Sequence, residues 1–216
     1  MLIEEAKWIN DALQSIALAP GSKVLNVGSS TRHFRSVVQP YIEELIFTPL
    51  RERGMNVSHL DIKEDEGVDI CGDLLDPVFL NELSDKQFDS IICSNLLEHV
   101  IERDQLCEAL VKLMKPHAKL LVTVPFRYPY HKDPIDTLYR PTIEELAQSF
   151  RGTKLIDAMY VESSMSMMRN MYSNWKFGVI SLARLVSFTS REWGKYIKYV
   201  PYIPSKYSAT CILLEK

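Results

Sequence analysis

Two aspartates, twelve residues apart, have the type and spacing that suit ligand binding. Asp61 comes near the end of an apolar run in SHLDI, and Asp73 follows a second apolar run in CGDLLD. One ionised carboxylate can accept hydrogen bonds from both vicinal hydroxyls of a ribose. Ligands of open α/β sheets bind beyond the carboxyl ends of the strands, so two acids there predict an adenosine pocket. The alternative is that both aspartates cap the turns or helices that follow them.

The elements that must position these aspartates alternate along the chain. Apolar runs predict strands at 23–27, 57–62, 68–71, 88–94, 119–124, 154–160 and 208–214. Helical spacing predicts helices at 2–18, 78–83, 96–114 and 142–150. This order predicts an α/β fold, a doubly wound and mainly parallel seven-stranded sheet. We interpret residues 1–216 as a single domain with a helical insertion at 163–207 before the last strand.

A turn of small residues, Gly28-Ser29-Ser30-Thr31, follows the first predicted strand, and a helix is expected to open at Thr31. Such a turn allows backbone N–H groups to approach a ligand closely. It therefore adds a second candidate binding element at the same edge of the sheet.

Composition narrows the class of protein. A net charge of −3 and a pI near 6.0 disfavour a dedicated duplex-DNA binder, so no nucleic-acid partner is expected. The four cysteines lack C-x-x-C spacing, which predicts a reducing compartment and no metal site. The amino terminus has acids where a signal peptide is basic, and no run of eighteen apolar residues occurs. We expect a cytoplasmic protein.

The loop at 125–141 holds the candidate catalytic residues, which are His131, Asp133, Asp136 and Tyr139. Histidine titrates near neutrality, and Asp133 is close enough in sequence to orient the ring. His131 is therefore a candidate general base. The alternative is that the two aspartates cap turns around Pro134 and that His131 is merely exposed.

Glu98 and His99 also invite a catalytic interpretation. On the helix predicted at 96–114, however, adjacent residues point to different faces. We therefore expect Glu98 and His99 not to form a pair.

The segment at 163–207 is basic and aromatic. Its seven lysines and arginines against one glutamate give 7 − 1 = +6, which leaves −9 on the rest of the chain. Interfacial helices have this character, so peripheral contact with a membrane or a lipid-linked acceptor is one interpretation. A solvated lid over the substrate side of the sheet is the other. A methionine cluster within it (Met165, Met167, Met168 and Met171) fits either a flexible acceptor pocket or helix core.

Together these segments resemble the class I S-adenosylmethionine-dependent methyltransferases. VLNVGSS is similar to the family's first motif, SHLDI to its second-strand acid segment, and CGDLLD to its adenine-side segment. FDSIICSNLLEHV and LVKLMKPHAKLLVTVP resemble its fourth and fifth strands with their neighbouring helices. The loop PYHKDPIDTLYRPT looks like that of a bacterial subgroup. The resemblance implies a Rossmann-like methyltransferase fold and S-adenosylmethionine as cofactor.

The resemblance also implies the cofactor-binding residues, which are Asn26, Gly28, Ser29, Ser30, Asp61, Ile62, Asp73, Leu74 and Asn95. Of these, Gly28 and Ser29 would approach the methionine part and Asp61 would hold the ribose. Ile62 would pack on the adenine, Asp73 and Leu74 would meet its edge, and Asn95 would lie near the amino-acid end.

Three positions depart from the family pattern. Asn26 stands where an acid is usual, and Ser30 and Arg32 stand where the second and third glycines are usual. Asn26 can still hydrogen-bond, but it offers no charge to the ammonium group of the cofactor.

These observations lead to one function and two rivals. We predict an enzyme that transfers a methyl group from S-adenosylmethionine to an oxygen or nitrogen of a small-molecule or glycan-like acceptor. One rival is a catalytically inactive relative that serves as a binding or scaffold protein. The other, a dinucleotide oxidoreductase, is disfavoured because Gly28 is not followed by the further glycines of that fingerprint.

Overall fold

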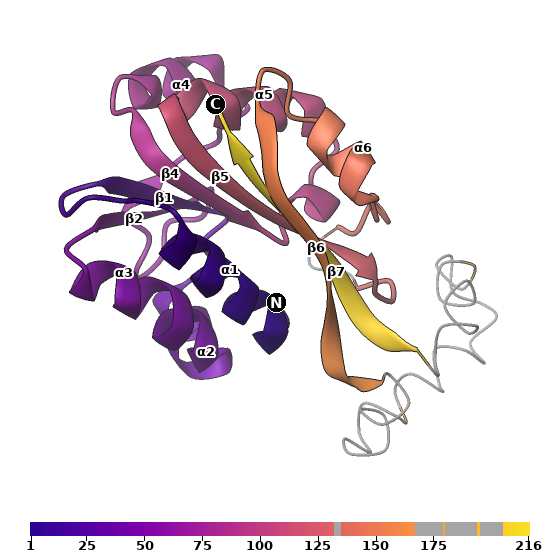
Figure 1. The fold of residues 1–216 in the computed structure, drawn as a ribbon. Helices are drawn as coiled ribbons and strands as arrows, with labels where there is room; N and C mark the ends of the chain where they lie inside the picture. Colours follow the sequence, from indigo (N-terminus) through magenta and orange to yellow (C-terminus); the bar gives the residue numbers. More distant parts are fainter. Residues whose placement is uncertain (132–134, 167–178, 180–193, 195–204) are drawn as a thin grey trace.

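The fold is a three-layer α/β sandwich in which helices cover both faces of one sheet (Figure 1). The computed structural model describes residues 1–131, 135–166, 179, 194 and 205–216. Its seven-stranded sheet has the order β3-β2-β1-β4-β5-β7-β6. The first five of these strands run parallel, and β7 runs antiparallel to both β5 and β6. The predicted fold class, mainly parallel and doubly wound, is confirmed.

The strands follow the apolar runs of the sequence. They are β1 (Lys23–Val27), β2 (Asn56–Asp61), β3 (Ile70–Cys71), β4 (Phe88–Ser94), β5 (Met114–Arg127), β6 (Lys154–Ser166) and β7 (Lys206–Glu215). Alternate side chains face opposite sides of a strand, and in β1 Leu25 and Val27 pack into one core while Val24 packs into the other. Burial on both faces explains why these strands read as continuous apolar runs.

The helices divide between the two cores. Leu25 and Val27 face the side covered by α4 (Pro77–Ser84), α5 (Arg103–Leu113) and α6 (Ile143–Gln148). The opposite side is covered by α1 (Ile3–Ser15), α2 (Pro40–Ile42) and α3 (Thr48–Glu52). Two π-helical stretches, η1 (Phe34–Val38) and η2 (Glu43–Phe47), precede and follow α2. The capping box expected of the helix after Thr142 is present, because Thr142 and Glu145 each accept a backbone N–H of the other.

The prediction of a single helix at 96–114 is wrong. A 3-10 turn, η3 (Leu97–His99), is followed by extended Val100, and α5 begins only at Arg103. In an α-helix the carbonyl of Glu98 would accept from the amide of residue 102. Here it accepts from the N–H and hydroxyl of Thr137, at 2.9 and 3.0 Å. A tertiary contact therefore takes the hydrogen bond that the helix would need.

β6 and β7 are longer than predicted and continue side by side beyond the rest of the sheet (Figure 1). Residues 163–166 and 206–207, expected to lie in the insertion, belong to these strands. The remainder of the insertion lies outside the described residues, apart from 179 and 194, and with it the expected lid or membrane contact. Within the described part of the chain, no helix combines the length and apolar character that crossing a bilayer requires.

Candidate functional site

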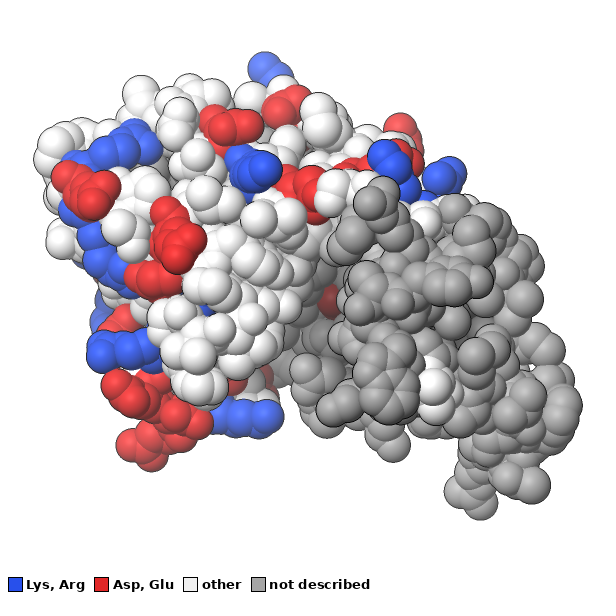
Figure 2. All heavy atoms as spheres, turned by 90° about the horizontal axis from the view of Figure 1, so that it is seen from below, with Lys and Arg blue, Asp and Glu red and all other residues white. Residues whose placement is uncertain are grey.

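One cavity of about 590 Å³ lies at the carboxyl ends of β1, β2 and β4. Its volume falls in the range of small-molecule sites. All nine residues predicted to bind a cofactor line it, namely Asn26, Gly28, Ser29, Ser30, Asp61, Ile62, Asp73, Leu74 and Asn95. In the view of Figure 2, the described surface carries acidic and basic side chains with an uncharged area between them. The nine residues predicted from the sequence therefore lie together in the structure.

Gly28 begins the turn that forms the floor of the cavity. Its φ of +67° is favourable for glycine, and a Cβ there would lie 3.0 Å from the side chain of Leu96. Ser30, where the family usually has glycine, also has a positive φ of 54°. The turn thus keeps the left-handed backbone of a glycine-rich loop while using a serine.

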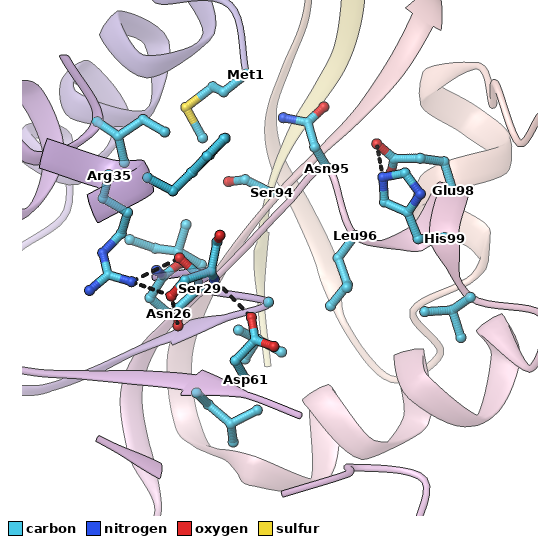
Figure 3. A pocket seen from close by; sticks show the side chains of 18 of the residues that line it. Met1, Asn26, Ser29, Arg35, Asp61, Ser94, Asn95, Leu96, Glu98 and His99 are labelled. Carbon is cyan, nitrogen blue, oxygen red and sulfur yellow. Dashed lines mark hydrogen bonds and ion pairs between the residues drawn. The ribbon is translucent and has the colours of Figure 1, made fainter. Parts of the chain in front are cut away.

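Asp61 ends β2 directly beside this turn (Figure 3). Its Oδ2 accepts a hydrogen bond of 2.8 Å from the N–H of Ser30, and its Oδ1 accepts one of 3.2 Å from the N–H of Lys63. Each carboxylate oxygen can accept further bonds, so Asp61 has capacity left for a ligand hydroxyl. The neighbouring Ile62 side chain is 67% exposed and lines the cavity, which suits packing on a flat ring.

Arg35 holds the other side of the turn, a role that no pattern in the sequence indicated. The guanidinium is buried and donates to the carbonyl oxygens of Ser29 at 2.9 Å, Ser30 at 2.6 Å and Gly67 at 2.8 Å. Figure 3 shows it reaching the turn from the side opposite Asp61. A planar fork of donors suits several carbonyls at once. Arg35 thus fixes where the amides of the turn point.

Asn26, the substitute for the usual acid, is engaged with a buried histidine. Its amide lies 3.1 Å from Nδ1 of His59, whose Nε2 lies 3.2 Å from Nη2 of Arg51. The guanidinium of Arg51 and the amide N–H of Asn26 can only donate, so both favour a neutral ring over a protonated one. Burial, aided by the charge of Arg35, lowers the pKa of His59 to about 3. Asn26 thus borders the cavity as part of a neutral buried pair.

Asp73 fits both interpretations made from the sequence, a cavity-lining residue and a turn cap. Asp73 lines the cavity and is exposed, while its Oδ1 caps the turn by accepting from the N–H of Leu75 at 2.9 Å. Leu74 is buried in the core below it. The capping interpretation of Asp73 is confirmed without removing it from the cavity.

Asn95 lies across the cavity from the Gly28 turn (Figure 3). It has a positive φ of 51°, and its side-chain amide donates to Oε1 of Glu5. The same oxygen accepts from the hydroxyl of Thr123, and Glu5 is buried beneath them. A carboxylate from α1 therefore reaches the wall of the cavity, a contact 90 residues apart in the sequence.

Of the four predicted catalytic residues, His131 alone among those described lines the cavity. Its Nδ1 lies 3.3 Å from Oδ2 of Asp136, so Asp136 takes the orienting role expected of Asp133, which lies outside the described residues. Burial works to raise the pKa of Asp136, but hydrogen bonds from His131 and Arg140 outweigh it and hold that pKa well below its usual range. Asp136 is an ionised group that accepts from the backbone N–H of His131 at 3.0 Å and faces its ring.

Tyr139 lies away from the cavity lining. Its hydroxyl lies 3.3 Å from Oγ of Ser149, and the guanidinium of Arg103 stacks over its ring at 4.4 Å. Burial raises the pKa of Tyr139. These contacts indicate a packing role.

Glu98 and His99 do contact each other, contrary to the expectation from a helix. Nε2 of His99 lies 3.7 Å from Oε1 of Glu98, and both side chains border the cavity (Figure 3). The 3-10 turn, together with the hydrogen bond from the ring of His99 to the carbonyl of Ile135, turns the imidazole toward the carboxyl. Burial raises the pKa of Glu98 to about 7. The ring of His131 lies against that of His99, with 5.2 Å between centroids.

Comparison with known proteins places this geometry in context. Residues 25–122 match a family model described as a methyltransferase domain. No curated protein sequence matches the chain.

Solved structures share the fold at low sequence identity. The [4+2]-cyclase SpnF is 16% identical with a TM-score of 0.61, over 98% of this chain and 80% of that one. Coclaurine N-methyltransferase, bound to N-methylheliamine and SAH, is 12% identical with a TM-score of 0.59, over 98% and 70%. The MccD protein is 11% identical with a TM-score of 0.56, over 97% of both chains.

The described residues fit a bound nucleoside cofactor. Gly28 has no side chain to block a ligand at the left-handed turn. Asp61 can accept further hydrogen bonds, and Ile62 offers exposed apolar surface. These three features line the same cavity as Glu98 and His99, which lie across it from Asp61 (Figure 3), and the ring of His131 lies against that of His99. A donor and an acceptor molecule could thus occupy the two sides together.

Proposed function

We propose that the chain is a class I S-adenosylmethionine-dependent methyltransferase that methylates an oxygen or nitrogen of a small-molecule or glycan-like acceptor. The observation that carries this proposal is the single cavity that joins the Gly28–Asp61 side to His131. A small molecule, N-methylheliamine, is bound to coclaurine N-methyltransferase, which has the same fold, and this supports a small acceptor.

The residues divide the work between binding and proton removal. S-adenosylmethionine, when bound, supplies a methyl group that is already activated by its sulfonium. The chain therefore needs mainly to align the acceptor and exclude water. Asp61 and Ile62 hold the nucleoside side, and Asn95 and Gly28 border the methionine side. For an acceptor that must lose a proton, His131 takes it at Nε2, because Nδ1 faces Asp136.

The experiment that tests this proposal is a screen for methyl incorporation. The purified chain is incubated with S-adenosylmethionine labelled in its methyl group and with fractionated metabolite and glycan extracts. The proposal expects label in a small-molecule or glycan fraction, lost in Asp61→Ala. Label found only in protein or nucleic acid would contradict the acceptor class.

A scaffold function is the second candidate. Asn26 in place of an acid favours it, because the amide is bound to His59 and carries no charge. The SpnF fold also carries a cyclase activity, so this fold does not by itself fix the reaction. Binding of S-adenosylmethionine without incorporation into any fraction would favour the scaffold.

A further inference from the structure

A buried carboxyl group on the acceptor side of the cavity lacks the partners such a group needs. The side chain of Glu98 is 0% exposed, and neither carboxyl oxygen has a hydrogen bond among the described residues. Buried polar groups almost always have a hydrogen-bond partner, so a buried carboxyl without one indicates that a ligand is missing. The ion pair with His99, at 3.7 Å, is longer than a hydrogen bond.

Two imidazoles complete the surroundings of this carboxyl. One ligand atom each from Glu98, His99 and His131 can be chosen so that all three lie within 4.8 Å of one another. Around a tetrahedral zinc ion, ligand atoms at bond lengths of about 2.0–2.2 Å lie roughly 3.3–3.6 Å apart. The Glu98–His99 separation of 3.7 Å is already near that value, so His131 is the ligand that would need to move inward.

The second partners of the two rings also match a metal site. Metal-bound histidines usually donate their other N–H to a carboxylate or a backbone carbonyl. Nδ1 of His99 bonds to the carbonyl of Ile135, and Nδ1 of His131 faces Asp136. The ring of His99 is therefore held through Nδ1, and its Nε2 faces the carboxyl of Glu98.

We propose that Glu98, His99 and His131 bind one divalent transition-metal ion in the wall of the cavity. Two imidazoles and one carboxylate suit Zn²⁺ and related ions and leave at least one coordination position open. The open position would accept an oxygen or nitrogen of the acceptor, a role that rests on the proposed methyl transfer. A ring nitrogen bound to a metal cannot also take a proton, so in the metal-loaded protein His131 is a ligand and the cation activates the acceptor.

Cobalt binding tests the site without any acceptor. The chelator-treated protein is titrated with Co²⁺, and visible absorption reports its coordination. Zn²⁺ then competes for the bound Co²⁺. We expect one Co²⁺ per chain. Glu98→Gln and His131→Ala should each raise the dissociation constant at least about tenfold, since even groups that only orient a ligand are worth about 10- to 100-fold.

His33→Ala is the matched control, because His33 is exposed and lies outside the cavity lining. Urea unfolding of each variant separates lost ligands from lost folding, and Glu98→Gln retains the size of the side chain. No stoichiometric binding by the wild type, or equal binding by all four proteins, would overturn the site. Titration with S-adenosylhomocysteine in the same preparation reports the cofactor side separately, so a failure of the metal site leaves methyl transfer standing.

Discussion

The carboxylate of Asp61 accepts a hydrogen bond of 2.8 Å from the backbone N–H of Ser30. This bond ties the end of β2 to the turn that follows β1. The residue proposed to bind the ribose and the turn proposed to bind the methionine part are therefore fixed relative to each other. Arg35 completes the arrangement from the carbonyl side of the same turn. Binding geometry on this side of the cavity is therefore built before a ligand arrives, which lowers the cost of binding.

Removing the Asp61 carboxylate should weaken cofactor binding. Asp61→Ala loses hydrogen bonds to a charged group, worth about 1.5–3 kcal/mol, or roughly 10- to 150-fold in affinity. Calorimetric titration with S-adenosylhomocysteine measures the change. Glu64→Ala removes a nearby exposed acid outside the cavity lining and should bind as the wild type does. Equal affinity in both variants would mean that Asp61 serves only the turn.

A side chain at Gly28 should cost stability through two separable effects. The positive φ of +67° is unfavourable for alanine, and the new Cβ meets Leu96 at 3.0 Å. Gly21→Ala isolates the first effect, because Gly21 has a φ of +87° and no heavy atom within 4 Å of the added Cβ. We expect about 1 kcal/mol for Gly21→Ala and a larger loss, about 2–3 kcal/mol, for Gly28→Ala in urea unfolding. Equal losses would show that Leu96 moves aside freely.

Replacing Arg35 should loosen the turn from within. Arg35→Met keeps much of the buried stem and leaves three carbonyl oxygens without their donor, those of Ser29, Ser30 and Gly67. We expect a loss of about 2–4 kcal/mol in the free energy of unfolding, and weaker binding of S-adenosylhomocysteine. Arg32→Met is the control, because its ion pair with Glu66 is largely exposed and contributes little. Similar unfolding of the two variants would contradict a structural role for Arg35.

Acid should destabilise the fold through His59. Its pKa of about 3 in the folded chain lies below the ordinary value of 6.5, so the unfolded chain binds the proton more tightly. The neutral ring therefore costs nothing above about pH 6.5, and stability falls as the pH drops from there toward 3. At pH 4.5 the loss from this group is about 2–3 kcal/mol. The difference in unfolding free energy between pH 7 and pH 4.5 should shrink in His59→Gln, and an unchanged difference would remove His59 as the cause.

The elements of the fold were predictable because both cores select for the same simple pattern. β1 and β4, buried on both faces, appear at their predicted bounds, and Asp61 and Gly28 lie together because parallel strands end at one edge. The resemblance to the methyltransferase family predicted nine cofactor-binding residues, and all nine line one cavity.

What the sequence did not reveal depends on contacts between distant segments. The fork from Arg35 and the reach of Glu5 to Asn95 involve no local pattern. The pairing of Glu98 with His99 required a break in the helix at 100–102, and that break follows from Thr137 occupying the carbonyl of Glu98. Propensity alone favoured a continuous helix there, and tertiary hydrogen bonding overrode it.

The most direct test of the central claim is a crystal structure of the chain with S-adenosylhomocysteine. We predict that the ribose hydroxyls lie within hydrogen-bonding distance of the Asp61 carboxylate, with the adenine against Ile62 and the homocysteine beside the Gly28 turn. A ligand bound elsewhere, or one whose ribose faces away from Asp61, would contradict the account.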